Sequence, residues 1–198
     1  MSATLNQDEL LRRYWEEVLQ GDARAYAQVH ELLHPVLYRY ASAMLNDEEL
    51  AADVIQDLFI KLWFKKERIG PLEHVRAFFF TALRRQALNQ LRSLRHLQII
   101  VPGAPDIVFS PEDIIIEEEQ ESARRDKIVQ YLASLPKRQR EVIYLRYYEE
   151  LSYQEVATVM GINYQSVINL SHKGMLQLRR LMGYISVLIS LVSGWFVR

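Results

Sequence analysis

The stretch LSYQEVATVMGINYQSVINLSHKG, residues 151–174, decides the fold of the C-terminal part of this chain. Ser152 and Glu155 have the spacing of a capping box, which begins a helix. Gly161 favours the left-handed conformation that ends a helix, and Asn163 is a good N-cap for a second one. Two short helices joined by so tight a turn predict a helix-turn-helix unit.

The second helix of this unit places polar side chains on one face. Gln165, Asn169 and His172 recur at helical spacing. In DNA-binding helix-turn-helix proteins the second helix enters the major groove, where Asn and Gln can pair with adenine. An ordinary helical hairpin with a polar outer face is the alternative. The helix-turn-helix unit spans Tyr153 to His172. The residues predicted to contact DNA are Tyr164, Gln165, Ser166, Asn169 and His172 within it, and Lys173 directly after it. Candidates for phosphate contacts are Arg138, Arg140, Arg146, Arg179 and Arg180.

The rest of the chain also has helical periodicity, and strand-like alternation is nearly absent. Only 7 glycines and 6 prolines interrupt the 198 residues, which favours an all-α fold. Pro35 lies inside one predicted helix and is expected to kink or break it. The expected helices cover residues 5–20, 23–45, 48–66, 72–96, 137–148, 152–160 and 164–182, with a further helix within 114–134.

The charge distribution divides the chain. Residues 101–122 hold 7 acidic and no basic side chains, whereas residues 123–198 hold 11 basic and 5 acidic ones, although the net charge is −1. The prolines at 102 and 105 break any helix at the start of the acidic run. We therefore predict two small helical domains joined by an acidic linker. Their expected boundaries are 5–96 for the first domain, 97–122 for the linker, 123–182 for the helix-turn-helix domain and 183–198 for an apolar extension.

Several classes of site are disfavoured by composition. The chain has no cysteine, which excludes disulfides and thiolate zinc sites. His30 and His34 have a spacing that suits a metal, but no third ligand stands nearby. No nucleophile–base set or phosphate loop appears, so we expect neither an enzyme nor a cofactor. The polar N-terminus has no apolar core of signal-peptide length, which predicts a cytoplasmic protein.

Two separate motifs resemble one family. Residues 135–167, LPKRQREVIYLRYYEELSYQEVATVMGINYQSV, resemble the promoter-binding domain of bacterial sigma factors, most closely the extracytoplasmic-function (ECF) group. Residues 53–59, DVIQDLF, with Leu62 and Trp63, resemble the polymerase-binding helix of that family. The segment from Arg76 to Arg92 resembles its promoter-melting helix. The resemblance covers about residues 10–180, with the motifs in the family's order.

This resemblance implies a division of labour between the domains. The first would bind core RNA polymerase and capture the −10 element of promoter DNA, partly as a single strand, and the second would bind the −35 element. The acidic linker would pass through the polymerase as a mimic of nucleic acid. One of Phe78, Phe79 and Phe80 is expected to be available to a base. The residues implied in polymerase binding are Asp53, Gln56, Asp57, Phe59 and Trp63. Those implied in −10 binding are Arg76, Phe79, Arg84, Arg85, Asn89 and Arg92.

The second domain departs from the family pattern at several positions. Ile168 and Leu170 stand where basic residues are common, which predicts weaker and less salt-dependent DNA binding. Ser171 replaces a usual apolar residue, and Gly174 a usual alanine. In the first domain Arg85 stands where the family often has asparagine, so the −10 preference is expected to differ.

The apolar segment 181–197 contains no charge but is shorter than the roughly 20 residues of a typical membrane span. We expect it to pack on the protein or on a partner such as an anti-sigma factor, and not to cross a membrane. Two other functions stay open at this point. One is a stand-alone helix-turn-helix regulator that works without polymerase, and the other is a membrane-tethered interaction protein.

Overall fold

The computed structural model describes residues 2–96, 105–109 and 122–182. Over these ranges the regular structure is helical and contains no strand, so the all-α prediction is confirmed. The N-terminal domain consists of α1 (Ser2–Leu19), α2 (Ala23–Leu45), α3 (Glu48–Ile69) and α4 (Val75–His96). The C-terminal domain consists of α5 (Ser122–Ala133), α6 (Lys137–Ile143), the π-helical turn η3 (Tyr144–Tyr148), α7 (Tyr153–Met160) and α8 (Tyr164–Met182).

Local chemistry sets the ends of α2 and α3. The Asp22 carboxylate caps α2, and the Asp47 carboxylate accepts a hydrogen bond from the Leu50 amide at the start of α3. Between these helices Asn46 adopts a left-handed conformation with φ of 53°. The helix continues through Pro35 and does not break there. Leu33 and Leu37 are buried on either side of the proline, and their packing holds the helix together.

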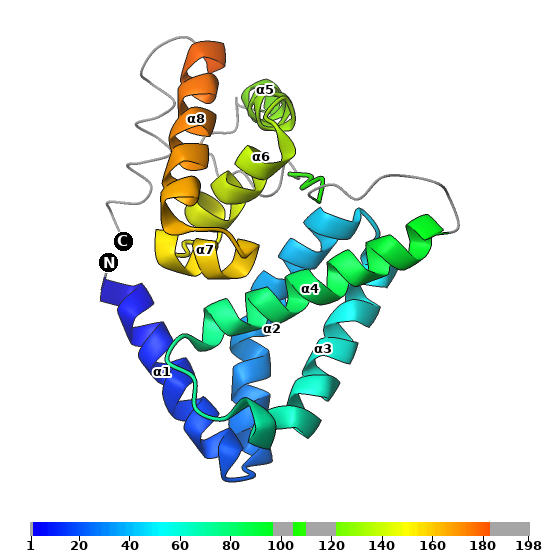
Figure 1. The fold of residues 1–198 in the computed structure, drawn as a ribbon, viewed down its shortest axis with the longest axis vertical. Helices are drawn as coiled ribbons and strands as arrows, with labels where there is room; N and C mark the ends of the chain where they lie inside the picture. The colour runs from blue at the N-terminus through cyan, green and yellow to red at the C-terminus, as the bar shows by residue number, and fades with distance from the viewer. Residues whose placement is uncertain (1, 97–104, 110–121, 183–198) are drawn as a thin grey trace.

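The core of the N-terminal domain forms where α4 crosses α2 and α3 (Figure 1). Trp15 of α1 is fully buried, meets the ring of Phe79 edge-on at 5.8 Å, and donates a hydrogen bond of 2.9 Å to the Gly70 carbonyl. Phe79 also contacts the buried Phe59 ring at 5.5 Å. These aromatic contacts join α1, α3 and α4 and fix the outer faces of α3 and α4.

The helix-turn-helix prediction is confirmed in detail. The Ser152 side chain accepts a hydrogen bond from the Glu155 amide, and the Glu155 carboxylate accepts one from the Ser152 amide. Gly161 ends α7 with φ of 63°, and the Asn163 side chain caps α8 through the Ser166 amide at 2.7 Å. The preceding segment differs from a single helix over 137–148, because its last turn is the π-helical η3.

Packing explains two departures from the family pattern. A Cβ atom on Gly174 would lie 3.3 Å from Cγ1 of Ile143, so a glycine lets α8 approach α6 closely. The Ser171 hydroxyl is buried and lies 3.3 Å from the Tyr147 hydroxyl and 3.4 Å from that of Tyr153. A polar side chain at 171 therefore completes a hydroxyl cluster with Tyr147 and Tyr153, and an apolar residue there would remove one partner from each phenol.

Residues 105–109, within the predicted acidic linker, pack against both domains. Ile107 and Phe109 are buried, and the Val108 amide donates a hydrogen bond of 2.9 Å to the Ala43 carbonyl of α2. Asp106 points the other way and pairs with Lys137 at 2.9 Å and with Arg140. The alternation of apolar and polar residues lets this segment bury its apolar side chains while its polar groups find partners.

Other predictions fall outside the described residues. They are the remainder of the linker, the start of the helix expected within 114–134, and the extension 183–198. Among the described helices none is long and apolar enough to cross a membrane.

Candidate functional site

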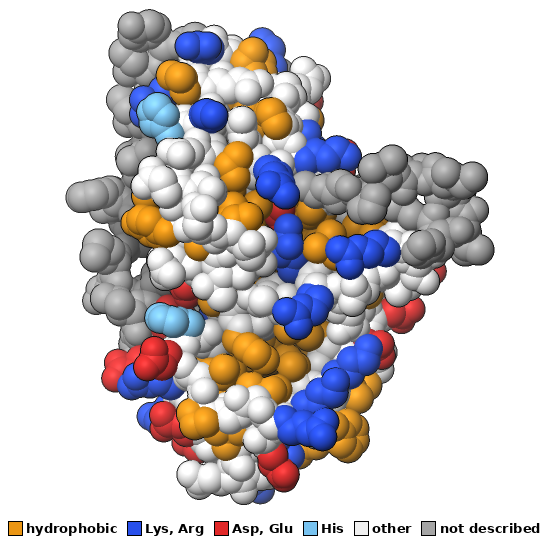
Figure 2. Space-filling view, in the orientation of Figure 1, with side chains coloured by type: hydrophobic (Ala, Val, Ile, Leu, Met, Phe, Trp, Pro, Cys, Tyr) orange, Lys and Arg blue, Asp and Glu red, His pale blue; other side chains and the backbone are white. Residues whose placement is uncertain are grey.

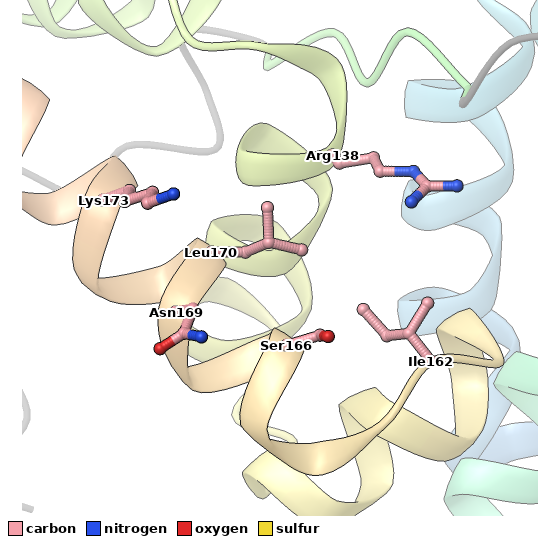
Figure 3. A pocket seen from close by; sticks show the side chains of 6 residues that line it. All are labelled: Arg138, Ile162, Ser166, Asn169, Leu170 and Lys173. Carbon is pink, nitrogen blue, oxygen red and sulfur yellow. The ribbon is translucent and has the colours of Figure 1, made fainter.

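The outer face of α8 carries the predicted base-contacting residues. Gln165 and Asn169 are exposed, and the Gln165 amide donates a hydrogen bond of 3.2 Å to the Asn169 side-chain oxygen. Beside them lies a shallow hollow of about 260 Å³ (Figure 3). Its lining combines apolar, polar and basic side chains, namely Arg138, Ile162, Ser166, Asn169, Leu170 and Lys173. A surface of this composition offers hydrogen-bonding groups for base edges and apolar contact for a thymine methyl group.

The remaining predicted residues of this domain also lie at its surface. His172 and Lys173 are exposed, and Tyr164 is 47% exposed with its ring edge-on to Tyr153. Arg179 and Arg180 are exposed in the last part of α8, where positive charge suits the helix dipole.

Two of the arginines proposed for phosphate contacts have internal roles instead. Arg140 is buried and donates hydrogen bonds to Asp106 and to the carbonyls of Ile107, Ala133 and Leu135. The Arg146 guanidinium lies over the Tyr153 ring, 4.9 Å from its centre, and donates to the Leu151 carbonyl. Arg138 remains exposed and lines the hollow. Sequence alone could not separate these arginines, because all lie in one basic segment.

The predicted polymerase-binding residues of α3 divide into exposed and buried sets. Asp53, Gln56 and Asp57 are exposed, with Asp57 paired to Lys61 at 2.8 Å. Phe59 is only 5% exposed, and the half-buried Trp63 packs against the Tyr26 ring at 5.1 Å. The Phe59 ring belongs to the core, which leaves little of it for direct contact with a partner.

Sequence reasoning missed two apolar side chains on the exposed face of α3. Ile60 is 48% exposed and Phe64 is 79% exposed. With Asp53, Gln56 and Asp57 they follow helical spacing along one face. The signal was present in the sequence, since both residues fall outside the apolar stripe of Val54, Leu58 and Leu62 that faces the core. We name these five outward residues of α3 the α3 ridge.

The predicted DNA-binding residues of α4 also divide. Arg85, Asn89 and Arg92 are exposed, and Arg92 donates a hydrogen bond of 3.3 Å to the Asn89 side chain. Phe79 and its neighbour Phe80 are fully buried, so neither ring is accessible to a base in this conformation.

Arg84 and Arg76 are engaged by carboxylates of the other domain. The Arg84 guanidinium donates to both carboxylate oxygens of Glu141, at 2.6 and 3.2 Å. Arg76 lies 3.4 Å from the carboxylate of Glu149. Burial lowers the pKa of Arg84, but its hydrogen bond to Glu141 and the charge of that carboxylate outweigh this effect, and the pKa is raised overall. On the described surface of α4, Arg85 and Arg92 are thus exposed, whereas Arg76 and Arg84 are paired with carboxylates of the other domain.

Histidines do not assemble a metal site in the described part of the chain, where no group of three or more potential ligands occurs. The His30 and His34 rings lie 4.8 Å apart and pack near Phe59. Burial, with a smaller contribution from the charge of His34, lowers the pKa of His30.

Comparison with known proteins identifies both domains. The family described as Sigma-70 region 2 matches residues 29–96, and the family described as Sigma-70, region 4 matches residues 125–178. The ECF RNA polymerase sigma factor SigL of Mycobacterium tuberculosis is 31% identical over 166 residues, covering 81% of this chain and 93% of the relative. SigK of Mycolicibacterium vanbaalenii is 26% identical over 189 residues, covering 91% of each.

Solved structures share the fold. The sigma factor RpoE of Bartonella quintana, in complex with the anti-sigma factor NepR, has a TM-score of 0.62 at 20% identity, covering 83% of this chain and all of the other (100%). CnrH, in complex with the cytosolic domain of CnrY, has a TM-score of 0.59 at 22% identity, covering 89% and 99%. With a relative of 31% identity matching most of its length, this chain belongs to the ECF sigma factors of bacterial RNA polymerase.

Proposed function

We propose that this sigma factor docks on core RNA polymerase through the α3 ridge and reads promoter DNA through the exposed faces of α4 and α8. As a sigma factor the chain is a transcription initiation factor and not an enzyme. The observation that carries the docking proposal is the exposure of Phe64 and Ile60 beside three polar residues. Apolar side chains exposed next to a polar rim are typical of protein interfaces.

In the second domain, α8 is proposed to enter the major groove at the −35 element. Gln165 and Asn169 would contact base edges, with Tyr164, Ser166 and His172 around them. Arg138 and Lys173 flank the hollow and would meet phosphates. Ile162 and Leu170 supply apolar surface in the hollow that suits a thymine methyl group. Leu170, an apolar residue where a basic one is expected, would then contribute to sequence preference.

In the first domain, α4 is proposed to hold the −10 element. Arg85, Asn89 and Arg92 are available for this in the described state. Arg76 and Arg84 would join them after release from their carboxylate partners. Phe79 would act indirectly by holding α4 against the core.

A protein inhibitor is a proposed partner. RpoE and CnrH, the similar solved structures, were each determined with a bound protein, described for RpoE as an anti-sigma factor. We propose an anti-sigma factor for this chain as well, and the cytoplasm, where RNA polymerase works, as its location.

The test is co-elution with purified bacterial core RNA polymerase on a size-exclusion column. The wild type should co-elute, and Phe64→Ala with Ile60→Ala should weaken the complex because the apolar part of the ridge is lost. Tyr164→Ala, an exposed change on α8, should leave the complex intact. A well-folded wild type that never co-elutes with its own host's core enzyme would reject this function. Equal binding by all three proteins would reject the α3 ridge as the docking surface.

A further inference from the structure

The two domains meet through buried carboxylates on one side and arginines on the other. The Glu141 and Glu149 side chains, from α6 and the residue after η3, have no exposed surface. Glu141 is held by Arg84 and by the Tyr40 hydroxyl of α2, which donates a hydrogen bond of 3.0 Å. Glu149 is held by Arg76 and by Arg39 of α2, the latter at 3.7 Å. Every one of these pairs joins the helix-turn-helix domain to the N-terminal domain.

Further contacts close the same boundary. In Figure 1, α7 lies against the first half of α4, and the domains pack directly there. The Tyr40 ring stacks near Tyr144 at 5.7 Å, and Phe109 of the segment 105–109 contacts Tyr144 at 5.2 Å. Segment 105–109 therefore bridges the domains, since Val108 is bonded to α2 while Asp106 is bonded to α6.

We propose that this interface is an autoinhibitory lock, in which Glu141 and Glu149 occupy Arg84 and Arg76 in place of DNA phosphates. A carboxylate and a phosphate make the same bidentate pair with a guanidinium, so one arginine cannot serve both at once. Arg84 keeps 16% of its side chain exposed and Arg76 keeps 11%, which leaves little surface for a strand of DNA. The inference rests on the proposed role of α4 in −10 binding. Figure 2 shows other Lys and Arg side chains exposed on both domains beside this boundary.

The chemistry of the pairs suits a reversible lock. Burying a carboxylate without a partner is costly, so neither glutamate would remain in this place without its arginine. A buried pair nevertheless gains little net free energy, because desolvation offsets most of the attraction. When the domains separate, water hydrates the carboxylates and arginines again, which recovers the free energy lost by burying them. A modest competing interaction with polymerase or DNA is then enough to separate the domains.

The lock predicts weaker DNA binding by the free chain than by an opened variant. The apparent affinity of a protein falls by the fraction of molecules in the binding-competent state. Removing the carboxylate charges in the double variant Glu141→Gln, Glu149→Gln should therefore tighten binding to single-stranded DNA. We expect about tenfold, within the usual range of couplings between sites.

The experiment measures opening and DNA binding separately. The chain has no cysteine, so Lys61→Cys on α3 and Arg179→Cys on α8 give unique positions for a pair of dyes. Energy transfer between the dyes should fall in the double glutamine variant. In unlabelled protein, the anisotropy of a fluorescein-labelled oligo-dT strand should report the tighter binding.

Controls separate the lock from charge and folding effects. Glu150→Gln removes one carboxylate charge at an exposed neighbour of Glu149 and should alter neither readout. Arg39→Gln removes the ion pair between Arg39 of α2 and Glu149, and it changes a half-exposed residue outside α4. This variant should also open the domains, and it provides the test if the double glutamine variant does not fold. If every folded variant gave the same energy transfer as Glu150→Gln, the lock would be overturned. Co-elution of the same proteins with polymerase would show that the proposed function still holds. Opening with unchanged DNA affinity would also overturn it, because α4 would then not be the masked surface.

Discussion

Arg140 and Asp106, which are 34 residues apart, are joined by a hydrogen bond of 2.7 Å from the guanidinium to the carboxylate. This contact fixes the segment 105–109 to α6, with Lys137 on the other carboxylate oxygen. The hydrogen bond from Lys137 lowers the pKa of Asp106. Burial opposes this, but the charges of Arg140 and Lys137 lower the pKa further, and it lies below its ordinary value overall. The segment between the domains is therefore tied by an ionised carboxylate.

Acid should weaken this tie. Because the folded pKa of Asp106 lies below its ordinary value of 3.8, the unfolded chain takes up this proton first as the pH falls. The stabilisation is thus complete above about pH 4 and is lost as the pH falls through the folded pKa. Asp106→Asn should lower the free energy of unfolding at neutral pH and reduce the further loss in acid. Urea denaturation across this pH range measures both effects, and Asp126→Asn on the exposed side of α5 is the control. Parallel curves for Asp106→Asn and wild type would contradict the prediction.

Enlarging Gly174 should strain the contact between α8 and α6. A Cβ there already lies 3.3 Å from Ile143, and valine adds two methyl groups to the same space. We expect Gly174→Val to lower the free energy of unfolding by about 1–3 kcal/mol through overpacking. Thermal denaturation followed by circular dichroism measures the change. Helix propensity cannot explain such a loss, because valine is a better helix former than glycine. Leu176→Val places the same side chain at a more exposed position of α8, and a loss as large in that variant would contradict crowding against Ile143 as the cause.

Removing the Ser171 hydroxyl should destabilise the helix-turn-helix domain. The hydroxyl is buried between those of Tyr147 and Tyr153, and alanine leaves these phenols with one partner fewer. Ser171→Ala should cost about 1 kcal/mol, the usual contribution of one buried hydrogen bond. Chemical denaturation measures this cost, and a midpoint unchanged from wild type would show that Ser171 adds nothing to the cluster.

A basic residue at position 170 should restore a phosphate contact. Leu170 lines the hollow together with Arg138 and Lys173 and is the apolar residue among these basic neighbours (Figure 3). Leu170→Lys should tighten binding to duplex promoter DNA and steepen the slope of log affinity against log salt by about 0.9. Leu181→Lys adds the same charge to an exposed site in the last turn of α8. If both variants change the slope equally, the hollow has no special place at the DNA.

The all-α fold and the helix-turn-helix could be predicted because their signals are local. Capping residues such as Ser152 and Asn163 act within one turn of helix, and the glycine at 161 acts on its own backbone. The consecutive phenylalanines of α4 were harder, since periodicity does not say which of Phe78, Phe79 and Phe80 meets the neighbouring helices.

No pattern in the sequence predicts the contacts between the domains. Arg84 and Glu141 are 57 residues apart, and either one alone is an ordinary charged residue of a helix. Ile107 and Phe109 alternate over too few residues to reveal that they are buried. Likewise, Arg140 resembles any basic residue of a DNA-binding segment until the carbonyls around it are known.

The carbonyls that bind Arg140 define the smallest fragment around the helix-turn-helix that would keep all the hydrogen bonds of this arginine. A fragment cut at Ser122 would keep the Ala133 and Leu135 oxygens that bind Arg140 but would lose Ile107 and Asp106. It would also uncover Glu141, whose Arg84 and Tyr40 partners belong to the other half of the protein. A fragment for study of the helix-turn-helix should therefore begin no later than Pro105. Even that fragment would carry two newly solvated carboxylates, Glu141 and Glu149, because the arginines that hold them belong to α2 and α4.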